Sequence, residues 1–230
     1  MLVHGAWHGG WCWRRVAERL AQAGRRVFTP TLTGLGERAH LLTNAVNLDT
    51  HVQDVVSVLE AEELENVVLV GHSYAGLVIS GVAARAKRRL RQLVYLDALL
   101  VEDGQSWAGA FPRDVAEARR KSATLTSGVK TLPPPDPQIY GFSDPADDEW
   151  VRRRLVPHPY APFEQKISWG CALGNGLPKT YVDCTSPALA VLAAMKPRNR
   201  SGWDFIELET GHDLMVSAPE ETARILLRYA

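Results

Sequence analysis

The chain is poor in cysteine and carries no excess charge, and these absences exclude several classes of protein. Its three cysteines, Cys12, Cys171 and Cys184, are widely spaced and form no Cys-x-x-Cys pair, so neither a disulfide framework nor a zinc site is indicated. Basic and acidic residues number 26 each, and the formal net charge of zero gives no reason to expect nucleic acid or an anionic membrane as a partner. No histidine and carboxylate spacing resembles a metal site, and neither a metal nor another cofactor is predicted.

Long apolar runs are also missing. No stretch reaches the length of a membrane span, and the chain opens with the strand-like Met1-Leu2-Val3 rather than with a charged, cleavable leader. Together with the few unpaired cysteines, this predicts a cytoplasmic protein without a membrane partner.

The most informative segment is an apolar run, residues 67–70, that ends in Gly71-His72-Ser73-Tyr74-Ala75-Gly76. A buried strand followed by a sharp turn and a helix of small residues is typical of a nucleophile elbow, which exposes the hydroxyl of Ser73 at its apex. Ala75 stands where the motif Gly-x-Ser-x-Gly has its second glycine, and it is small enough for a close approach of strand and helix. The alternative is an ordinary strand, turn and buried helix with an incidental serine.

Two further segments favour a nucleophilic hydrolase. Near the start, Leu2-Val3 runs into the glycine-rich loop that begins at His4, where the backbone N–H of Ala6 can pair with that of Tyr74 to hold an oxyanion. Near the end, a strand over 204–208 leads into a loop that carries His212, in the position of a general base. Serine first and histidine last is the order of an α/β-hydrolase triad.

Strands and helices alternate along most of the chain. Apolar spacing predicts helices over 13–23, 47–64 and 219–229 and strands over 27–31, 67–70, 93–96, 180–184 and 204–208. This order predicts the α/β class, with a mainly parallel sheet, helices on both of its faces and a ligand site at the carboxyl ends of the strands.

Residues 101–178 break the alternation. Proline clusters at 132–137 and 157–162 cannot continue helices or central strands. We expect a core made of residues 1–100 and 179–230 and a cap, residues 101–178, inserted over the site after the strand that follows the elbow; a surface excursion is the alternative. Aromatic side chains are expected to line an apolar substrate pocket, namely Trp7, Trp107, Trp150 and Trp169.

The segment from His4 to Trp13, the Gly71-His72-Ser73 elbow and Gly211-His212 together resemble one branch of the α/β-hydrolase superfamily. That branch contains plant methylesterases, hydroxynitrile lyases and small bacterial carboxylesterases. The resemblance implies the α/β-hydrolase fold and a cofactor-free serine carboxylesterase that acts on small, apolar or aromatic esters through an acyl-enzyme.

The acid of the triad departs from the family pattern. In the family it stands two positions beyond the threonine that is Thr185 here, where this chain has Ser186 and Pro187. Some hydrolases of this fold carry the acid after the strand next to the elbow, and Asp97 stands there. Four alternatives remain open: Glu102, Asp103, Asp183 and a dyad without an acid.

Two other functions compete with ester hydrolysis. Hydroxynitrile lyases of this family have a threonine and a lysine where this chain has Ala6 and Asp213, and an anion beside the base would repel cyanide. A hormone-binding or receptor-like module with little turnover is the third possibility, and the intact Ser73 and His212 argue against it. Among the other histidines, His72 is expected in the sheet packing and His4 as a brace of the oxyanion loop, whereas no role is predicted for His8, His40, His51 or His158.

Overall fold

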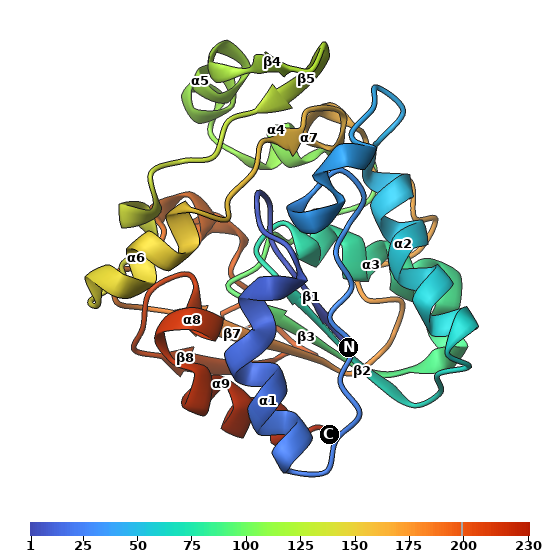
Figure 1. Ribbon diagram of the computed structural model, residues 1–230. Coiled ribbons are helices and arrows are strands. Elements are labelled where there is room, and N and C mark those ends of the chain that lie inside the picture. Colours follow the sequence, from blue (N-terminus) through green and yellow to red (C-terminus); the bar gives the residue numbers. More distant parts are fainter. Residues whose placement is uncertain (199) are drawn as a thin grey trace.

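A five-stranded parallel sheet forms the centre of the computed structural model, which describes residues 1–198 and 200–230 (Figure 1). Its strand order is β1-β2-β3-β7-β8, and all four neighbouring pairs are parallel. The strands are β1 (Leu2–Val3), β2 (Val67–His72), β3 (Leu90–Leu96), β7 (Lys179–Cys184) and β8 (Asp204–Leu208). The predicted fold class is therefore confirmed.

Helices cover both faces of the sheet. In Figure 1, α1 (Arg14–Gln22) and α9 (Pro219–Leu227) lie together on one side, and α2 (Leu48–Ala61) and α3 (Ala75–Ala86) lie on the other. Because successive side chains of a strand point to opposite faces of the sheet, each central strand contributes side chains to two hydrophobic clusters, one on each face. Leu69 of β2 belongs to the cluster beneath α2 and α3, whereas its neighbour Val70 belongs to the cluster beneath α1 and α9.

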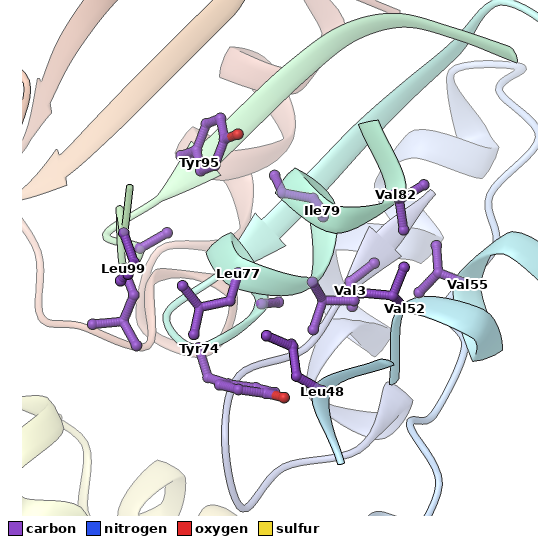
Figure 2. Close-up of a cluster of buried hydrophobic side chains, with 14 of the residues drawn as sticks. Val3, Leu48, Val52, Val55, Tyr74, Leu77, Ile79, Val82, Tyr95 and Leu99 are labelled. Carbon is purple, nitrogen blue, oxygen red and sulfur yellow. The ribbon is translucent and has the colours of Figure 1, made fainter. Parts of the chain in front are cut away.

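The cluster beneath α2 and α3 is the larger of these two cores and reaches the elbow. Figure 2 shows Val52 and Val55 of α2 packed toward Ile79 and Val82 of α3, with Tyr74 at the edge nearest the turn. The side chain of Tyr74 is fully buried. Burial of this cluster thus fixes the helix that follows the serine.

Residues 101–178, the inserted segment, follow β3 and precede β7 and form a series of short elements (Figure 1). Strands β4, β5 and β6 make a small antiparallel sheet. The elements are α4 (Trp107–Ala110), α5 (Arg113–Ser122), β4 (Thr124–Thr126), β5 (Val129–Leu132), η4 (Pro137–Tyr140), α6 (Pro145–Arg152), β6 (His158–Pro159) and α7 (Ala161–Glu164).

One predicted strand does not form. Residues 27–31 run beside β1, and the N–H of Leu2 donates to the carbonyl oxygen of Phe28 at 2.8 Å, but no continuous ladder follows. Pro30 has no N–H to donate, which interrupts such a ladder. The remaining elements are short: η1 (Gly10–Trp13), η2 (Gly36–Leu41), η3 (Lys87–Arg89), η5 (Ala190–Met195) and α8 (Leu214–Ser217). Among the described residues, every helix is too short or too polar to cross a membrane.

Candidate active site

Three residues with strained backbones mark the carboxyl ends of adjacent strands. Trp7 follows β1 with a φ of +65°, Ser73 follows β2 with +53°, and Asp97 follows β3 with +41°. A residue with a side chain that is held at positive φ costs about 1–3 kcal/mol in conformational free energy, and such residues concentrate at functional sites. The three turns lie at the same edge of the sheet, where the carboxyl ends of its strands meet. The sequence predicts a ligand site at this edge.

The turn at Ser73 is held by backbone hydrogen bonds and by two glycines. The N–H of Ser73 donates to the carbonyl oxygen of Leu96 at 3.1 Å, and the N–H of Leu99 donates to that of Ser73 at 2.9 Å. A Cβ on Gly71 would lie 2.7 Å from the carbonyl oxygen of Ala75, and a Cβ on Gly76 would lie 2.2 Å from that of Leu99. Glycine is therefore needed at 71 and 76, whereas Ala75 fits.

Asp97 and His212 meet although 115 residues separate them. The Nδ1 of His212 lies 2.6 Å from Oδ2 of Asp97, and both side chains are buried. The other carboxylate oxygen, Oδ1, lies 3.6 Å from the ammonium nitrogen of Lys196. The N–H of Asp97 donates to the carbonyl oxygen of Val182 at 2.8 Å, which fixes this carboxylate relative to β7.

The other candidate carboxylates are paired elsewhere. Asp183 is held by Lys196 and by Arg198, Glu102 pairs with Arg200 at 2.6 Å, and Asp103 accepts from the N–H of Trp169 at 2.5 Å. Thus only Asp97, among the carboxylates considered from the sequence, contacts the ring of His212 in the part of the chain that the structure describes.

The loop of His212 rests on the inserted segment. The N–H of His212 donates to the carbonyl oxygen of Tyr140 at 3.0 Å, and the Tyr140 ring stacks on that of His212 with centres 5.8 Å apart. A Cβ on Gly211 would lie 2.0 Å from the same carbonyl oxygen, so this approach requires glycine. Ser73 is half-buried, and no hydrogen bond joins its hydroxyl to the His212 ring across the described residues.

His4 orients the peptide group that carries the Ala6 N–H. Its Nε2 accepts from the N–H of Leu32 at 3.0 Å, which leaves the proton on Nδ1, 2.8 Å from the carbonyl oxygen of Gly5. Burial lowers the pKa of His4 to about 3, so the ring is neutral. Because the Gly5 carbonyl and the Ala6 N–H belong to one planar peptide group, holding the first directs the second.

His8 and Asp213 form a buried ion pair that the sequence did not suggest. Nε2 of His8 lies 2.9 Å from Oδ2 of Asp213, and Nδ1 lies 2.7 Å from the carbonyl oxygen of Ala6. Burial alone would lower the pKa of His8, but the charge and hydrogen bond of Asp213 raise it above its ordinary value. Burial opposes ionisation of Asp213 as well, yet the facing His8 lowers the pKa of that carboxyl. The pair links the oxyanion loop to the residue after His212.

Two more buried histidines are neutral supports. His72 Nε2 lies 2.9 Å from the carbonyl oxygen of His212, and burial together with the nearby His212 lowers the pKa of His72 to about 3. His51 Nδ1 lies 2.8 Å from the hydroxyl of Tyr74, and burial lowers the pKa of His51 to about 4. His72 thus lies within the packing behind the elbow, and His51 fixes the ring next to Ser73.

Two of the four tryptophans predicted for the pocket gather beside Tyr74. The Trp107 ring centre lies 5.2 Å from that of Tyr74 and 6.3 Å from that of Trp7. Trp7 also joins the two parts of the chain, because its Nε1–H donates to the carbonyl oxygen of Leu132 at 3.0 Å and its own carbonyl oxygen accepts from Val156 at 3.0 Å.

The contacts of the other two tryptophans lie away from Tyr74, and their place in the pocket stays a prediction. Trp150 packs on Trp11 with ring centres 5.0 Å apart, over α1, and the ring of Trp169 lies against Gly81, two turns along α3 from the elbow. Trp150 belongs to α6 and Trp169 to an irregular stretch, and each ring packs on the surface that the folded chain brings near it.

A metal would have to compete with bonds already made. Ligand atoms of His72, His212 and Asp213 lie within 4.8 Å of one another. However, Nδ1 of His212 faces Asp97 and Oδ2 of Asp213 faces His8. We therefore assign these groups hydrogen-bonding roles, and the absence of a metal cofactor stays a prediction.

Comparison with known proteins places the chain in a family. Residues 1–225 match the model of the alpha/beta hydrolase family. The chain is 39% identical to a carbendazim hydrolyzing esterase of Nocardioides sp. (strain SG-4G), over 98% of this chain and 97% of that protein. It is 31% identical to putative methylesterase 14, chloroplastic, of Arabidopsis thaliana, over 73% of this chain and 52% of that protein.

A solved structure shares the fold. An extracellular alpha/beta-hydrolase from a Paenibacillus species superposes with a TM-score of 0.86 at 24% identity, over 100% of this chain and 97% of that one. Sheet order, elbow and family match agree with the resemblance seen in the sequence. The chain belongs to the alpha/beta hydrolase family.

Proposed function

We propose that this protein hydrolyses small carboxylic esters, with Ser73 as nucleophile, His212 as general base and Asp97 as the acid that orients it. The observation that carries the proposal is the buried contact of 2.6 Å between His212 and Asp97 beside a serine on a strained turn. Esterases among the relatives support the same reaction class.

The first half of the reaction forms an acyl-enzyme. Ser73 Oγ attacks the ester carbon while Nε2 of His212 takes the hydroxyl proton, and the resulting imidazolium donates from Nδ1 to Asp97. The contact between serine and histidine tightens when substrate is bound, as is common for catalytic hydrogen bonds. The backbone N–H groups of Ala6 and Tyr74 donate to the oxyanion, and the leaving alcohol takes the proton from Nε2.

The second half repeats these steps with water. His212 removes a proton from the water, the hydroxide attacks the acyl carbon, and Ser73 Oγ leaves with the proton from Nε2. Apart from the ester and this water, both halves use only groups of this chain. His4 and the His8–Asp213 pair keep the oxyanion loop in place through the carbonyl oxygens of Gly5 and Ala6.

We assign the inserted segment the role of a cap that holds the substrate. Support comes from Trp107 and Tyr140, which lie against Tyr74 and His212 respectively. The aromatic surroundings favour small apolar or aromatic esters, and the name of the bacterial relative suggests adding carbendazim to the substrates tested.

A panel of nitrophenyl and aryl esters of graded acyl length tests the proposal. We expect hydrolysis of short esters and no release of cyanide from mandelonitrile above the buffer rate, because Asp213 stands where a lyase of this family has a lysine. Cyanide release without ester hydrolysis would instead identify a lyase. Binding of esters without turnover would identify a receptor-like module.

A further inference from the structure

Arg119 stands apart from the other two arginines of helix α5. Arg113 pairs with Glu117 at 2.8 Å and Arg120 pairs with Glu164 at 2.7 Å, both near the surface. Arg119 is half-buried, and no carboxylate of residues 1–198 or 200–230 pairs with it. Its guanidinium carbon lies 5.0 Å from the ring centre of Trp7. Trp7 is the residue that follows Ala6, whose N–H is proposed to hold the oxyanion.

Two buried polar side chains near Arg119 also lack partners. The hydroxyl of Tyr140 and both ring nitrogens of His158 make no hydrogen bond within the described residues. Tyr140 stacks on His212, and the ring centre of His158 lies 4.6 Å from that of Tyr74 and 6.2 Å from that of Trp7. A buried polar group without a partner costs about 1–3 kcal/mol, so such groups call for an explanation.

The charge of Arg119 acts on both of these groups. Burial raises the pKa of Tyr140 well above its ordinary value, the charge of Asp213 raises it further, and Arg119 partly opposes the rise. Burial lowers the pKa of His158, and the neighbouring His51 and His4 and then Arg119 lower it further. His158 is therefore neutral, with one nitrogen that donates and one that accepts, whereas Arg119 remains a cation with several N–H donors. Arg119 and His158 both lie beside Trp7, and Tyr140 lies against His212, so donors and one positive charge border the oxyanion loop and the general base.

We propose that Arg119, Tyr140 and His158 form a subsite for an anionic oxygen group, such as a carboxylate, that the ester substrate carries apart from its scissile bond. A guanidinium held on an aromatic face and partly removed from water binds a carboxylate more strongly than an exposed one. The hydroxyl of Tyr140 adds a donor on the side of His212. The preferred substrates are then esters with a second, acidic function, either on the acyl chain or on the leaving group.

This inference rests on the proposed ester hydrolysis, and matched substrate pairs keep the two separable. On the acyl side, mono-4-nitrophenyl glutarate is compared with 4-nitrophenyl butyrate. On the leaving-group side, 4-acetoxybenzoate is compared with phenyl acetate. If the wild type hydrolyses none of the four, the proposed function fails. If it hydrolyses the neutral esters but prefers neither anionic one, only the subsite fails.

Arg119→Gln tests the residue itself. We expect kcat/KM for the preferred anionic ester to fall about tenfold or more, as for loss of one charge-assisted hydrogen-bonded pair, while kcat/KM for its neutral counterpart changes less than about twofold. Arg119→Lys should retain part of the preference because it keeps the charge. Tyr140→Phe should reduce the preference with the same sign, since it removes only the hydroxyl.

Arg113→Gln, on the same helix with an exposed side chain, is the matched control and should leave all four rates unchanged. Competitive inhibition by glutarate gives a second readout, and it should weaken in Arg119→Gln. An equal loss for neutral and anionic esters would mean that Arg119 only supports Trp7, and this result would overturn the subsite. Unchanged preference and inhibition in Arg119→Gln would overturn it as well.

Discussion

The strands of the core and the outer elements of the inserted segment differ in how deeply their side chains are buried. In β2, β3 and β7 nearly every side chain is buried, so register and strand ends are fixed by packing on both faces. In the inserted segment, α5 buries only Ala116, β4 buries no side chain, and Leu125 is 74% exposed. The central strands are packed tightly enough to align reacting atoms, whereas α5 and β4 have little packing of their own.

Backbone hydrogen bonds and ring contacts join the two regions beside the site. Trp7 of the oxyanion loop bonds to Leu132 and Val156, and the loop of His212 bonds to Tyr140. The groups proposed to change covalent bonds, Ser73 and His212, lie in the core, and those proposed to hold the substrate lie largely in the segment. Core substitutions should therefore lower kcat, and substitutions in the segment should change KM and selectivity.

The largest effect is expected for the nucleophile. Ser73→Ala should reduce ester hydrolysis to the uncatalysed background, because the neighbouring hydroxyl of Tyr74 is buried against His51, while the midpoint of thermal unfolding changes little. A fluorophosphonate should label the wild type once and the variant not at all. Ser80→Ala, which removes a buried hydroxyl on the helix that follows the elbow, serves as control and should still be labelled once by the fluorophosphonate. Labelling that persists in Ser73→Ala would show that another residue is the nucleophile.

A somewhat smaller loss is expected for the acid. Asp97→Asn should fold normally yet lose about a thousandfold or more in kcat, because the amide no longer favours the His212 tautomer that accepts the serine proton. Asp183→Asn and Asp103→Asn should lose little, since these carboxylates bond elsewhere. Steady-state kinetics on one ester decides the matter, and a comparable loss in Asp183→Asn would contradict the assignment of Asp97.

The ion pair between His8 and Asp213 should appear mainly in stability. Asp213→Asn leaves His8 buried without its counter-ion, and the free energy of unfolding should fall by about 3–5 kcal/mol. Asp136→Asn, which breaks an exposed pair with Arg152, should lower the free energy of unfolding far less, because water screens that pair. Urea unfolding of both variants measures these losses in the free energy of unfolding. Equal losses would show that the buried pair stabilises the protein no more than the exposed one.

The same pair predicts a pH window. The raised pKa of His8 means that its contribution is complete below the ordinary value of 6.5 and is lost as pH rises through the raised value. The lowered pKa of Asp213 means that its contribution is present above the ordinary value of 3.8 and is lost as pH falls through the lowered value. The stability gap between wild type and Asp213→Asn should be widest between these limits and shrink outside them.

The smallest effect is expected in the inserted segment. Trp107→Leu should raise KM for aryl esters severalfold with little change in kcat, because this ring lies beside Tyr74 but on no reacting atom. Trp169→Leu, against Gly81, should leave KM unchanged. Kinetics on aryl and alkyl esters separates the two variants. A large loss of kcat in Trp107→Leu would contradict the proposal that the core carries out the reaction and the inserted segment only binds the substrate.

Local patterns in the sequence predicted most of the core and half of the site. Alternation of helices and strands predicted the parallel sheet, and the turn at Ser73, the loop at Ala6 and the loop at His212 each follow from residues near one another in the chain. Only the strand over 27–31 was wrong, because its fate depended on pairing with β1 rather than on its own composition.

Contacts between distant residues were decided by the tertiary structure. From the sequence Asp97 was one of several carboxylates, and the pairing of His8 with Asp213, 205 residues away, had no local signal at all. The directions of Trp150, Trp169 and Arg119 depended likewise on which surfaces the folded chain brought near them. Backbone sterics and apolar periodicity act over a few residues and can be read along the chain, whereas the partner of a buried charge or ring is fixed only when packing brings remote segments together.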